Sequence, residues 1–389
     1  MSADRDQDIE LKLMEFRGAK VLHARLQEVL DKAVFYLLKS PGTDVVNIVG
    51  PTGVGKSMLV GRIEAKIVMA KASAMRENRN MRPFVSVVAV ASGHRAFDFK
   101  RLYAAVLEQL GDPFAKVLPS VGRSYSENGN AIITRGRRGA TTAAVRERLE
   151  RELELRGTAV WCVDEAQHAV FGGKSGPPKF QLEVFKSIAQ SGSTKLCLIG
   201  PPELEDQLLT SGQLARRSMT IHFPRYRPDG DDLVQFASVA HWFFEQMKFA
   251  STPSVEDNID FIYKGSLGCV GVMKDWFERA MAVAMSRHDD LDAVQLTIEH
   301  LRETRMAGNS LALMLEEIQR MERLMESNAD DESSDRAGLS DLLPTPEPPA
   351  RKRSGVGGAD KSLPKRRKPK PGIRGPGRDA VGGSEAWGA

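Results

Sequence analysis

The sequence has little of what marks an exported, disulfide-bonded or membrane-spanning protein. Its three cysteines, Cys162, Cys197 and Cys269, lie far apart in apolar surroundings, without the spacing of a metal site or a disulfide framework. No apolar run approaches the roughly 20 residues that cross a bilayer. The first residues are charged and lack the apolar core of a signal peptide. We therefore expect a soluble, cytoplasmic protein without membrane contacts, in which the cysteines are buried thiols.

The C-terminal part lacks the residues that build a core. Residues 326–347 hold seven acids and one base, whereas residues 351–378 hold eleven bases and one acid. Pro, Gly and Ser are dense in both blocks, and almost no branched apolar residues follow Leu343. Such a segment cannot bury enough surface to offset its chain entropy. We predict a disordered tail over 326–389, acidic and then basic. The basic block suits nucleic acid phosphates or an acidic protein face, and a solubilising linker without a partner is the alternative.

Short apolar runs alternate with helical patterns over the first half of the chain. Apolar residues recur at helical intervals between 11 and 38, up to the break at Ser40-Pro41-Gly42. The apolar runs that we predict to be buried strands are 45–49, 84–90, 158–163, 195–199 and 219–223. The helical patterns between them are 57–74, 97–110, 141–155 and 180–190. This alternation predicts an α/β fold with a mostly parallel, five-stranded sheet flanked by helices.

The strand signal ends near Pro228. Helical patterns follow at 230–248, 255–264, 269–286 and 291–327, which predicts a small helical lid. Residues 112–139 interrupt the core with Gly, Ser, Asn and basic residues, so we predict an exposed loop or insertion there. The predicted domains are an N-terminal helical segment at 1–43, an α/β core at 44–228, a lid at 229–325 and the tail at 326–389.

A phosphate-binding motif follows the first predicted strand. The segment VVNIVGPTGVGKSMLV places G-x-x-x-x-G-K-S between a strand and a helix, as a P-loop requires. The glycines let backbone N–H groups point inward at a polyphosphate, and the following helix adds its positive N-terminal end. Lys56 should reach the β- and γ-phosphates, and the Ser57 hydroxyl should ligate Mg²⁺. The predicted ATP-binding residues are Gly50, Pro51, Thr52, Gly53, Val54, Gly55, Lys56, Ser57 and Met58.

An acidic pair ends the third predicted strand, in TAVWCVDEAQH. Asp164 is placed to hold Mg²⁺ together with Ser57. Glu165 is placed to orient and deprotonate the attacking water. Solvated turn residues are the alternative for an isolated acidic pair. Beside a P-loop, the pair predicts ATP hydrolysis, with ATP and Mg²⁺ as cofactors.

Two further cationic positions are candidates for contact with the phosphates. Arg216 and Arg217, in GQLARRSMTIHF, precede the last predicted strand and are candidate catalytic residues that act on a neighbouring subunit's nucleotide. Solvated arginines at a helix end are the alternative. Lys274, in KGSLGCVGVMKDW, lies in the first turns of a predicted lid helix that could face the γ-phosphate. A simply solvated lysine is the alternative there.

Residues 15–290 resemble AAA+ ATPases, and within them the TniB/TnsC group of DNA transposition regulators. The likeness rests on GPTGVGKS, VDEAQH, LIGPPEL and GQLARRS. The resemblance implies a ring or helical filament of this chain on duplex DNA. It also implies a transposase and a target-selection adaptor as partners, with hydrolysis controlling release. Two positions depart from the group: Gly200-Pro201-Pro202 stands where a polar γ-phosphate sensor is usual, and Lys274 where an arginine is often found.

Binding to the DNA backbone would need exposed cations. The candidates are Lys100, Arg101, Arg135, Arg137 and Arg138, although a solvated surface explains any one of them. Two other functions stay open at this point. The first is a signalling or secretion-associated ATPase that acts on proteins without DNA. The second treats DEAQ as a helicase box, which the small region after Pro228 disfavours because no second motor domain fits there.

Overall fold

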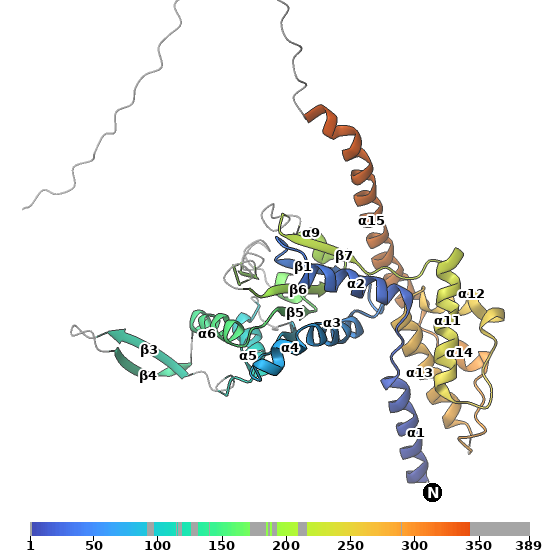
Figure 1. The fold of residues 1–389 in the computed structure, drawn as a ribbon. Coiled ribbons are helices and arrows are strands. Elements are labelled where there is room, and N and C mark those ends of the chain that lie inside the picture. The colour runs from blue at the N-terminus through green and yellow to red at the C-terminus, as the bar shows by residue number, and fades with distance from the viewer. Residues whose placement is uncertain are drawn as a thin grey trace, which may run out of the picture. The chain divides into compact units, whose positions relative to one another are not determined.

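The computed structural model describes most of the first 342 residues. The described residues are 2–91, 97–113, 115, 119–125, 131–139, 141–171, 184–185, 187–188, 193–208, 216–288 and 290–342. Contacts group residues 1–335 into one compact unit and residues 336–389 into a second. Figure 1 shows the helices and strands in order along the chain. In the described part, no helix is both long enough and apolar enough to cross a bilayer.

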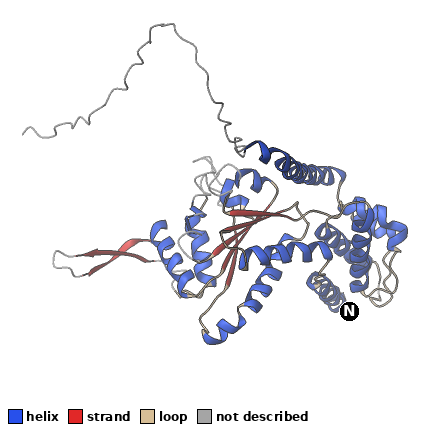
Figure 2. Cartoon of the chain, turned by 45° about the horizontal axis from the view of Figure 1, so that its top comes forward, coloured by secondary structure: helices blue, strands red, loops and turns tan. Residues whose placement is uncertain are grey.

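Five parallel strands form the central sheet, in the order β2-β5-β6-β1-β7. They are β1 (Val45–Val49), β2 (Phe84–Val88), β5 (Val160–Asp164), β6 (Lys195–Gly200) and β7 (Ser218–His222). Parallel strands joined by crossover helices are covered on both faces, as Figure 2 shows for the strands of the central sheet. The predicted α/β class and the mostly parallel five-stranded sheet are confirmed.

Alternating side chains divide the sheet between two cores. On β1, Val46 and Ile48 pack with α2 (Ala24–Leu38) and α3 (Lys56–Ala70). Val45 and Val49 point to the opposite face, where they belong to a second apolar cluster. The helices that contribute to this second cluster are α5 (Phe99–Gln109), α6 (Thr142–Leu155), α7 (Gln167–Phe171) and α9 (Glu203–Leu208).

Several predicted boundaries were wrong. The helical pattern at 11–38 is two helices, α1 (Ser2–Gly18) and α2, because the chain breaks at Gly18 and the His23 side chain caps α2 by accepting from Leu26 N. The pattern at 57–74 likewise divides into α3 and α4 (Ala72–Glu77). Most of the predicted helix at 180–190 lies outside the described residues.

The predicted loop at 112–139 is largely a β-hairpin. β3 (Pro119–Tyr125) pairs with β4 (Ala131–Gly139) in an antiparallel ladder that is separate from the central sheet. The Gly and Ser residues suggested a loop, yet backbone hydrogen bonds between the two strands do not depend on side-chain type. Arg135, Arg137 and Arg138 lie on β4, and Arg135 is opposite Val121 in the register.

Helices follow the sheet, as predicted for the lid. They are α11 (Gly230–Met247), α12 (Val255–Ser266), α13 (Val270–Ser286), α14 (Ile298–Thr304) and α15 (Gly308–Leu342). The single helix predicted at 291–327 is therefore α14 and α15, since Thr297 starts a new helix with a capping box. α15 also continues past the boundary placed at 325, because extending a helix that is already formed costs far less than starting one. Residues 343–389, with most of the predicted tail, lie outside the described residues.

The first helix packs on the lid. Phe16 of α1 is 1% exposed and lies 5.9 Å, ring centre to ring centre, from Phe243 of α11. The apolar residues of α1 join the same cluster as those of α11, α12 and α13. The predicted N-terminal segment at 1–43 therefore contributes α1 to the lid and α2 to the sheet.

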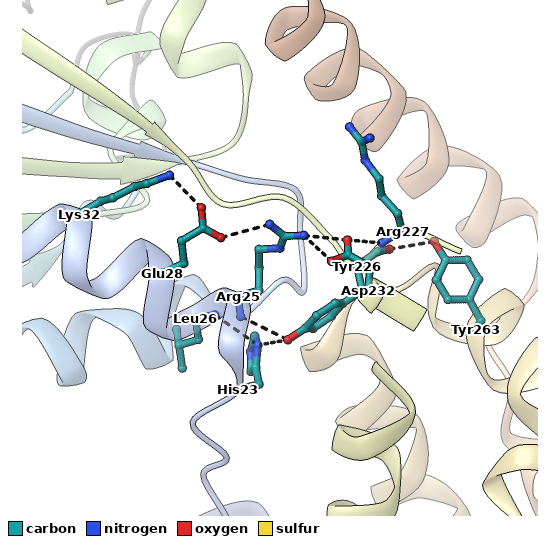
Figure 3. A network of polar contacts seen from close by, with 9 residues as sticks. All are labelled: His23, Arg25, Leu26, Glu28, Lys32, Tyr226, Arg227, Asp232 and Tyr263. Atoms are coloured by element: carbon teal, nitrogen blue, oxygen red, sulfur yellow. Dashed lines mark hydrogen bonds and ion pairs between the residues drawn. The ribbon is translucent and has the colours of Figure 1, made fainter. Parts of the chain in front are cut away.

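A buried polar network joins the sheet side to the lid at the connection between β7 and α11 (Figure 3). The Tyr226 hydroxyl lies 3.0 Å from Nδ1 of His23, and Tyr263 donates to the Tyr226 carbonyl at 2.9 Å. Nη2 of Arg25 donates to both carboxylate oxygens of Asp232, each at 2.7 Å. Hydrogen bonds between two charged groups are stronger than those between neutral groups. The start of α2 is thus held against the start of the lid.

Candidate nucleotide-binding site

The loop between β1 and α3 has the geometry of a phosphate cradle. Gly53 and Gly55 have φ angles of +77° and +116°, in the left-handed region that favours glycine. α3 begins at Lys56, so its unpaired N-terminal N–H groups face the loop. The Lys56 ammonium donates to the carbonyls of Gly50 at 2.6 Å and Pro51 at 3.0 Å. Burial lowers the pKa of Lys56, and the carboxylates of Glu317, Glu165 and Asp164 act in the opposite sense.

The lid packs directly on this loop. The backbone N–H of Gly271, at the start of α13, donates to the Gly53 carbonyl at 2.7 Å. A Cβ atom on Gly271 would lie 2.5 Å from that carbonyl oxygen, and a Cβ on Gly53 would lie 2.4 Å from Cγ2 of Val272. The P-loop and α13 are therefore in backbone-to-backbone contact, which leaves no room for a side chain on either glycine.

The structure brings Ser57 and Asp164 together. The Ser57 hydroxyl donates to Oδ2 of Asp164 at 3.3 Å, and the backbone N–H of Glu165 donates to Oδ1 at 2.9 Å. Burial raises the pKa of Asp164, and the hydrogen bond from Glu165 partly offsets that effect. A hydroxyl and a carboxylate are oxygen ligands of the kind Mg²⁺ prefers, so this pair fits the ion. Among the described residues there is no group of three or more His, Cys, Asp or Glu side chains that could hold a metal alone. The remaining Mg²⁺ ligands would be phosphate and water.

Glu165 stands in an unusual backbone conformation. Its φ angle is +52°, in the left-handed region that a residue with a side chain rarely adopts. Holding a residue there costs about 1–3 kcal/mol, and such strain gathers at functional sites. The Glu165 carboxylate accepts a hydrogen bond from Nε2 of Gln167, at the start of α7. The contact with Gln167 holds this carboxylate beside Asp164.

A groove of about 940 Å³ opens at these residues. Its size suits a ligand as large as a nucleoside triphosphate. The lining residues come from the P-loop, the ends of β5 and β6, α13 and α15; they are Thr52, Gly53, Gly55, Lys56, Ser57, Met58, Glu165, Gln167, Pro201, Glu203, Gly271, Asp275, Leu313, Glu316, Glu317, Arg320 and Arg323. The carboxyl ends of parallel strands are where α/β folds place their ligands.

The contribution of α15 was missed by the sequence analysis. Glu317 accepts from the backbone N–H and the hydroxyl of Thr52, and Arg320 forms ion pairs with Glu203 and Asp206 on α9. No motif surrounds these residues, and their helical spacing indicated only a helix. Gln167 was also missed as a site residue, although it stands inside the quoted VDEAQH segment.

Lys274 is not brought to the groove. Its ammonium donates to the carbonyls of Arg17 and Ala19, each at 2.7 Å, at the end of α1. In this structure the lysine therefore joins the lid to the N-terminal segment. The expectation that it faces the γ-phosphate does not agree with these contacts. The neighbouring α13 residues Gly271 and Asp275 line the groove instead.

Arg216 and Arg217 precede β7, at the amino ends of the parallel strands. The P-loop lies at the opposite, carboxyl ends. Arg217 pairs with Asp44 at 2.9 Å, and Ser218 is level with Val45 in the register. At about 3.3 Å per residue, the length of β1 places Arg217 roughly 16 Å from the P-loop of its own chain. Both arginines are exposed. They are therefore open to a second subunit, and their catalytic role stays a prediction.

The candidate DNA-contacting residues form two separate groups. Lys100 and Arg101 lie in the first turn of α5, where the Arg101 N–H is capped by Asp98. Arg135, Arg137 and Arg138 belong to β4. Lys100 and Arg101 are not among the residues that line the nucleotide groove.

Comparison with known proteins identifies the central part of the chain. Residues 42–208 match the family described as AAA domain. This match covers less than half of the chain. With its parallel five-stranded sheet and its P-loop, the chain has the P-loop AAA+ fold and is an ATPase. A comparison with curated protein sequences gave no match.

Solved structures with some similarity to this chain have low sequence identity to it. The ORC2 protein of Aeropyrum pernix in its ADP form is 15% identical, with a TM-score of 0.50 over 74% of this chain and 69% of that one. The ORC1 protein of the same organism, in complex with DNA, is 16% identical, with a TM-score of 0.49 over 74% and 65%. A Walker-type ATPase of Pyrococcus abyssi is 18% identical, with a TM-score of 0.44 over 78% and 76%.

Proposed function

We propose that this ATPase is a DNA-associated switch. In its specific form the proposal is a regulator of DNA transposition that oligomerises on target duplex DNA and recruits or stimulates a transposase. The observation that carries the proposal is that Lys56, Ser57 and Glu165 line one groove, with Asp164 hydrogen-bonded to Ser57. The lid packs on the P-loop at the same place. Such a site binds ATP, hydrolyses it and can report its state to the lid.

Each side chain has a distinct task in this proposal. The P-loop N–H groups and the ammonium of Lys56 bind the phosphates, for which Lys56 leaves its present carbonyl partners. Ser57 and Asp164 would hold Mg²⁺, which offsets the phosphate charge when bound. Glu165 takes a proton from the water that attacks the γ-phosphorus, and the products are ADP and phosphate.

Switching would use the contact between the P-loop and the lid. The Gly53 carbonyl that receives Gly271 N–H belongs to the same loop that surrounds the phosphates. If the P-loop changes conformation between the ATP and ADP states, the change reaches α13 directly through this hydrogen bond. Lid rotation is a common way to alter a subunit interface.

DNA as the partner is supported by charge and by sequence resemblance. Eleven bases against one acid in residues 351–378 give a strong attraction for phosphate. Three arginines on β4, the half-buried Lys100 and the exposed Arg101 add further cations. The step to transposition, with a transposase and a target-selection adaptor as partners, rests on GPTGVGKS, VDEAQH, LIGPPEL and GQLARRS. It is a proposal from sequence likeness.

Electron microscopy of the purified protein with duplex DNA tests the proposal. We expect rings or helical filaments on DNA with ATP or a non-hydrolysable analogue, and their loss with ADP. Lys56→Ala, which removes the phosphate-binding ammonium, is the control that should not assemble. Absence of DNA binding with every nucleotide at low salt would contradict the proposal. It would favour an ATPase that acts on proteins without DNA.

A further inference from the structure

The carboxyl end of β6 carries no side chain, although it borders the nucleotide groove. β6 ends at Gly200, next to β5, whose end supplies Asp164. Gly200 is followed by Pro201 and Pro202, which have no backbone N–H. This strand end therefore offers the groove no polar side chain and, at the two prolines, no N–H donor.

The amide of Gln167 occupies the space that a side chain on β6 would take. A Cβ atom built on Gly200 would lie 2.9 Å from Oε1 of Gln167. Gln167 itself lines the groove. The first residue of α7 thus places a polar group at the end of β6, and Gly200 is the residue that leaves room for it.

This amide is bound to the proposed base. Nε2 of Gln167 donates to Oε2 of Glu165. The orientation is fixed by chemistry, since a carboxylate accepts only and the opposite orientation would place two oxygens against each other. One of the two Nε2 hydrogens is used, so the second is available to a phosphate oxygen or to water. Oε1 is buried and has no hydrogen-bond partner among the described residues.

We infer that Gln167 is a positioning residue for ATP hydrolysis. It holds the Glu165 carboxylate toward the groove and supplies the polar contact that the end of β6 lacks. The inference rests on the proposed role of Glu165. It explains why Glu165 needs a second constraint: its backbone is strained at a φ of +52°, and an unsupported carboxylate on a strained turn would sample many orientations.

Steady-state ATP hydrolysis by the full chain tests the inference through Gln167→Ala. We expect kcat to fall by about tenfold to a hundredfold, the usual range for loss of a partner that orients another residue of a site. KM and the binding of a fluorescent ATP analogue should stay within about twofold. His168→Ala is the matched control, because His168 follows on the same helix, is similarly half-buried and does not line the groove. An unchanged or increased kcat in Gln167→Ala, with ATP binding intact, would overturn the inference.

Gln167→Glu separates positioning from a merely structural effect. It keeps the length of the side chain but replaces the donating amide with a carboxylate, which repels Glu165 instead of holding it. We expect kcat to fall at least as far as in Gln167→Ala, while KM stays within about twofold of the wild type. A kcat equal to that of the wild type, with ATP binding intact, would also count against the inference.

The wild type and Glu165→Gln distinguish the two possible failures. If the wild type does not hydrolyse ATP, or if Glu165→Gln turns over normally, the proposed site chemistry is wrong. If Glu165→Gln is inactive while Gln167→Ala and Gln167→Glu behave like the wild type, only the role of Gln167 is refuted.

Discussion

The carboxylate of Glu317 accepts hydrogen bonds from the backbone N–H of Thr52 at 2.9 Å and from its hydroxyl at 3.2 Å. A residue of α15 is therefore bound to the P-loop across 265 positions of sequence. The same carboxylate is the foremost of those that oppose the lowering of the Lys56 pKa by burial. Its negative charge stands beside the position where the triphosphate binds.

Removing that charge should strengthen ATP binding. Glu317→Gln keeps the shape of the side chain and its acceptor oxygen, but ends the repulsion between carboxylate and phosphate. We expect the Kd for ATP to fall by about threefold to tenfold, the size of one partly screened charge contact. The effect should weaken in high salt. Titration of a fluorescent ATP analogue measures it.

Glu326→Gln is the control for that titration, because Glu326 is exposed on the same helix and does not line the groove. Equal Kd values for the wild type and Glu317→Gln would show that the Glu317 carboxylate does not weaken ATP binding.

Variants of Lys56 and Glu165 should separate ATP binding from ATP hydrolysis. Lys56→Ala removes the ammonium that reaches the phosphates, so ATP binding should be lost. Glu165→Gln keeps the groove and should bind ATP normally, with turnover reduced by at least about a hundredfold. Calorimetric titration and phosphate release measure the two steps. Normal turnover by Glu165→Gln would remove it from the role of base.

Arg217→Ala should act only in the assembled protein. The Arg217 guanidinium lies at the amino ends of the strands, away from the P-loop of its own chain. A nucleotide that it contacts would therefore be bound to a neighbouring subunit. We expect ATPase activity to fall by about a hundredfold or more at concentrations where subunits assemble. Activity of dilute monomers should not change, and Arg216→Ala measured alongside shows which arginine acts. A loss of the same size in monomers would exclude action between subunits.

His23 should make the folded protein less stable in acid. Its burial, together with the nearby Arg25 charge, lowers the pKa of His23 from 6.5 to about 4. Between these values the unfolded chain binds more protons than the folded one. The contribution of His23 is therefore complete above pH 6.5 and is lost as the pH falls toward 4. At pH 5 the loss is about 2 kcal/mol.

Denaturant unfolding at pH 7 and pH 5 measures that loss. His23→Asn keeps an acceptor at the start of α2 but does not titrate in this range. The variant should lose less stability than the wild type between the two pH values. The same loss in both proteins would place the acid sensitivity elsewhere.

Gly271→Ala should separate the lid from the P-loop. Its Cβ would lie 2.5 Å from the Gly53 carbonyl oxygen, which is backbone and cannot rotate away. We expect a loss of about 1–3 kcal/mol in the free energy of unfolding, together with weaker ATP binding, because the loop must shift. Gly308→Ala is the matched control: a Cβ there meets nothing within 4 Å. If the two variants have the same stability and the same Kd for ATP, the contact between Gly271 and Gly53 contributes to neither.

Much of the fold was predictable because its signals are local. Apolar runs such as Val45–Val49 and Val160–Asp164 are buried throughout, which is typical of parallel strands covered on both faces. The P-loop motif also predicted its own structural context, a strand before it and a helix after it. Whether Lys56, Ser57, Asp164 and Glu165 perform the chemistry assigned to them awaits the variants above.

What the sequence did not reveal depends on distant contacts. Glu317 and Arg320 reach the groove only because α15 packs on the lid through Ile318, beside Cys269 and Val272. Lys274 points to the end of α1, a helix that no local pattern assigns to the lid. The hairpin at 119–139 was missed because strand pairing is non-local and its Gly and Ser residues resemble those of a loop.

The division of the N-terminal segment bears on how the lid can move. α1 packs on the lid and α2 on the sheet, so residues 19–23 cross the same junction as the connection through Tyr226. The two crossings touch, since His23 contacts the Tyr226 hydroxyl at 3.0 Å (Figure 3). Two segments of the chain therefore join the lid to the sheet, and they are in contact with each other. A movement of the lid at this junction has to displace both segments together.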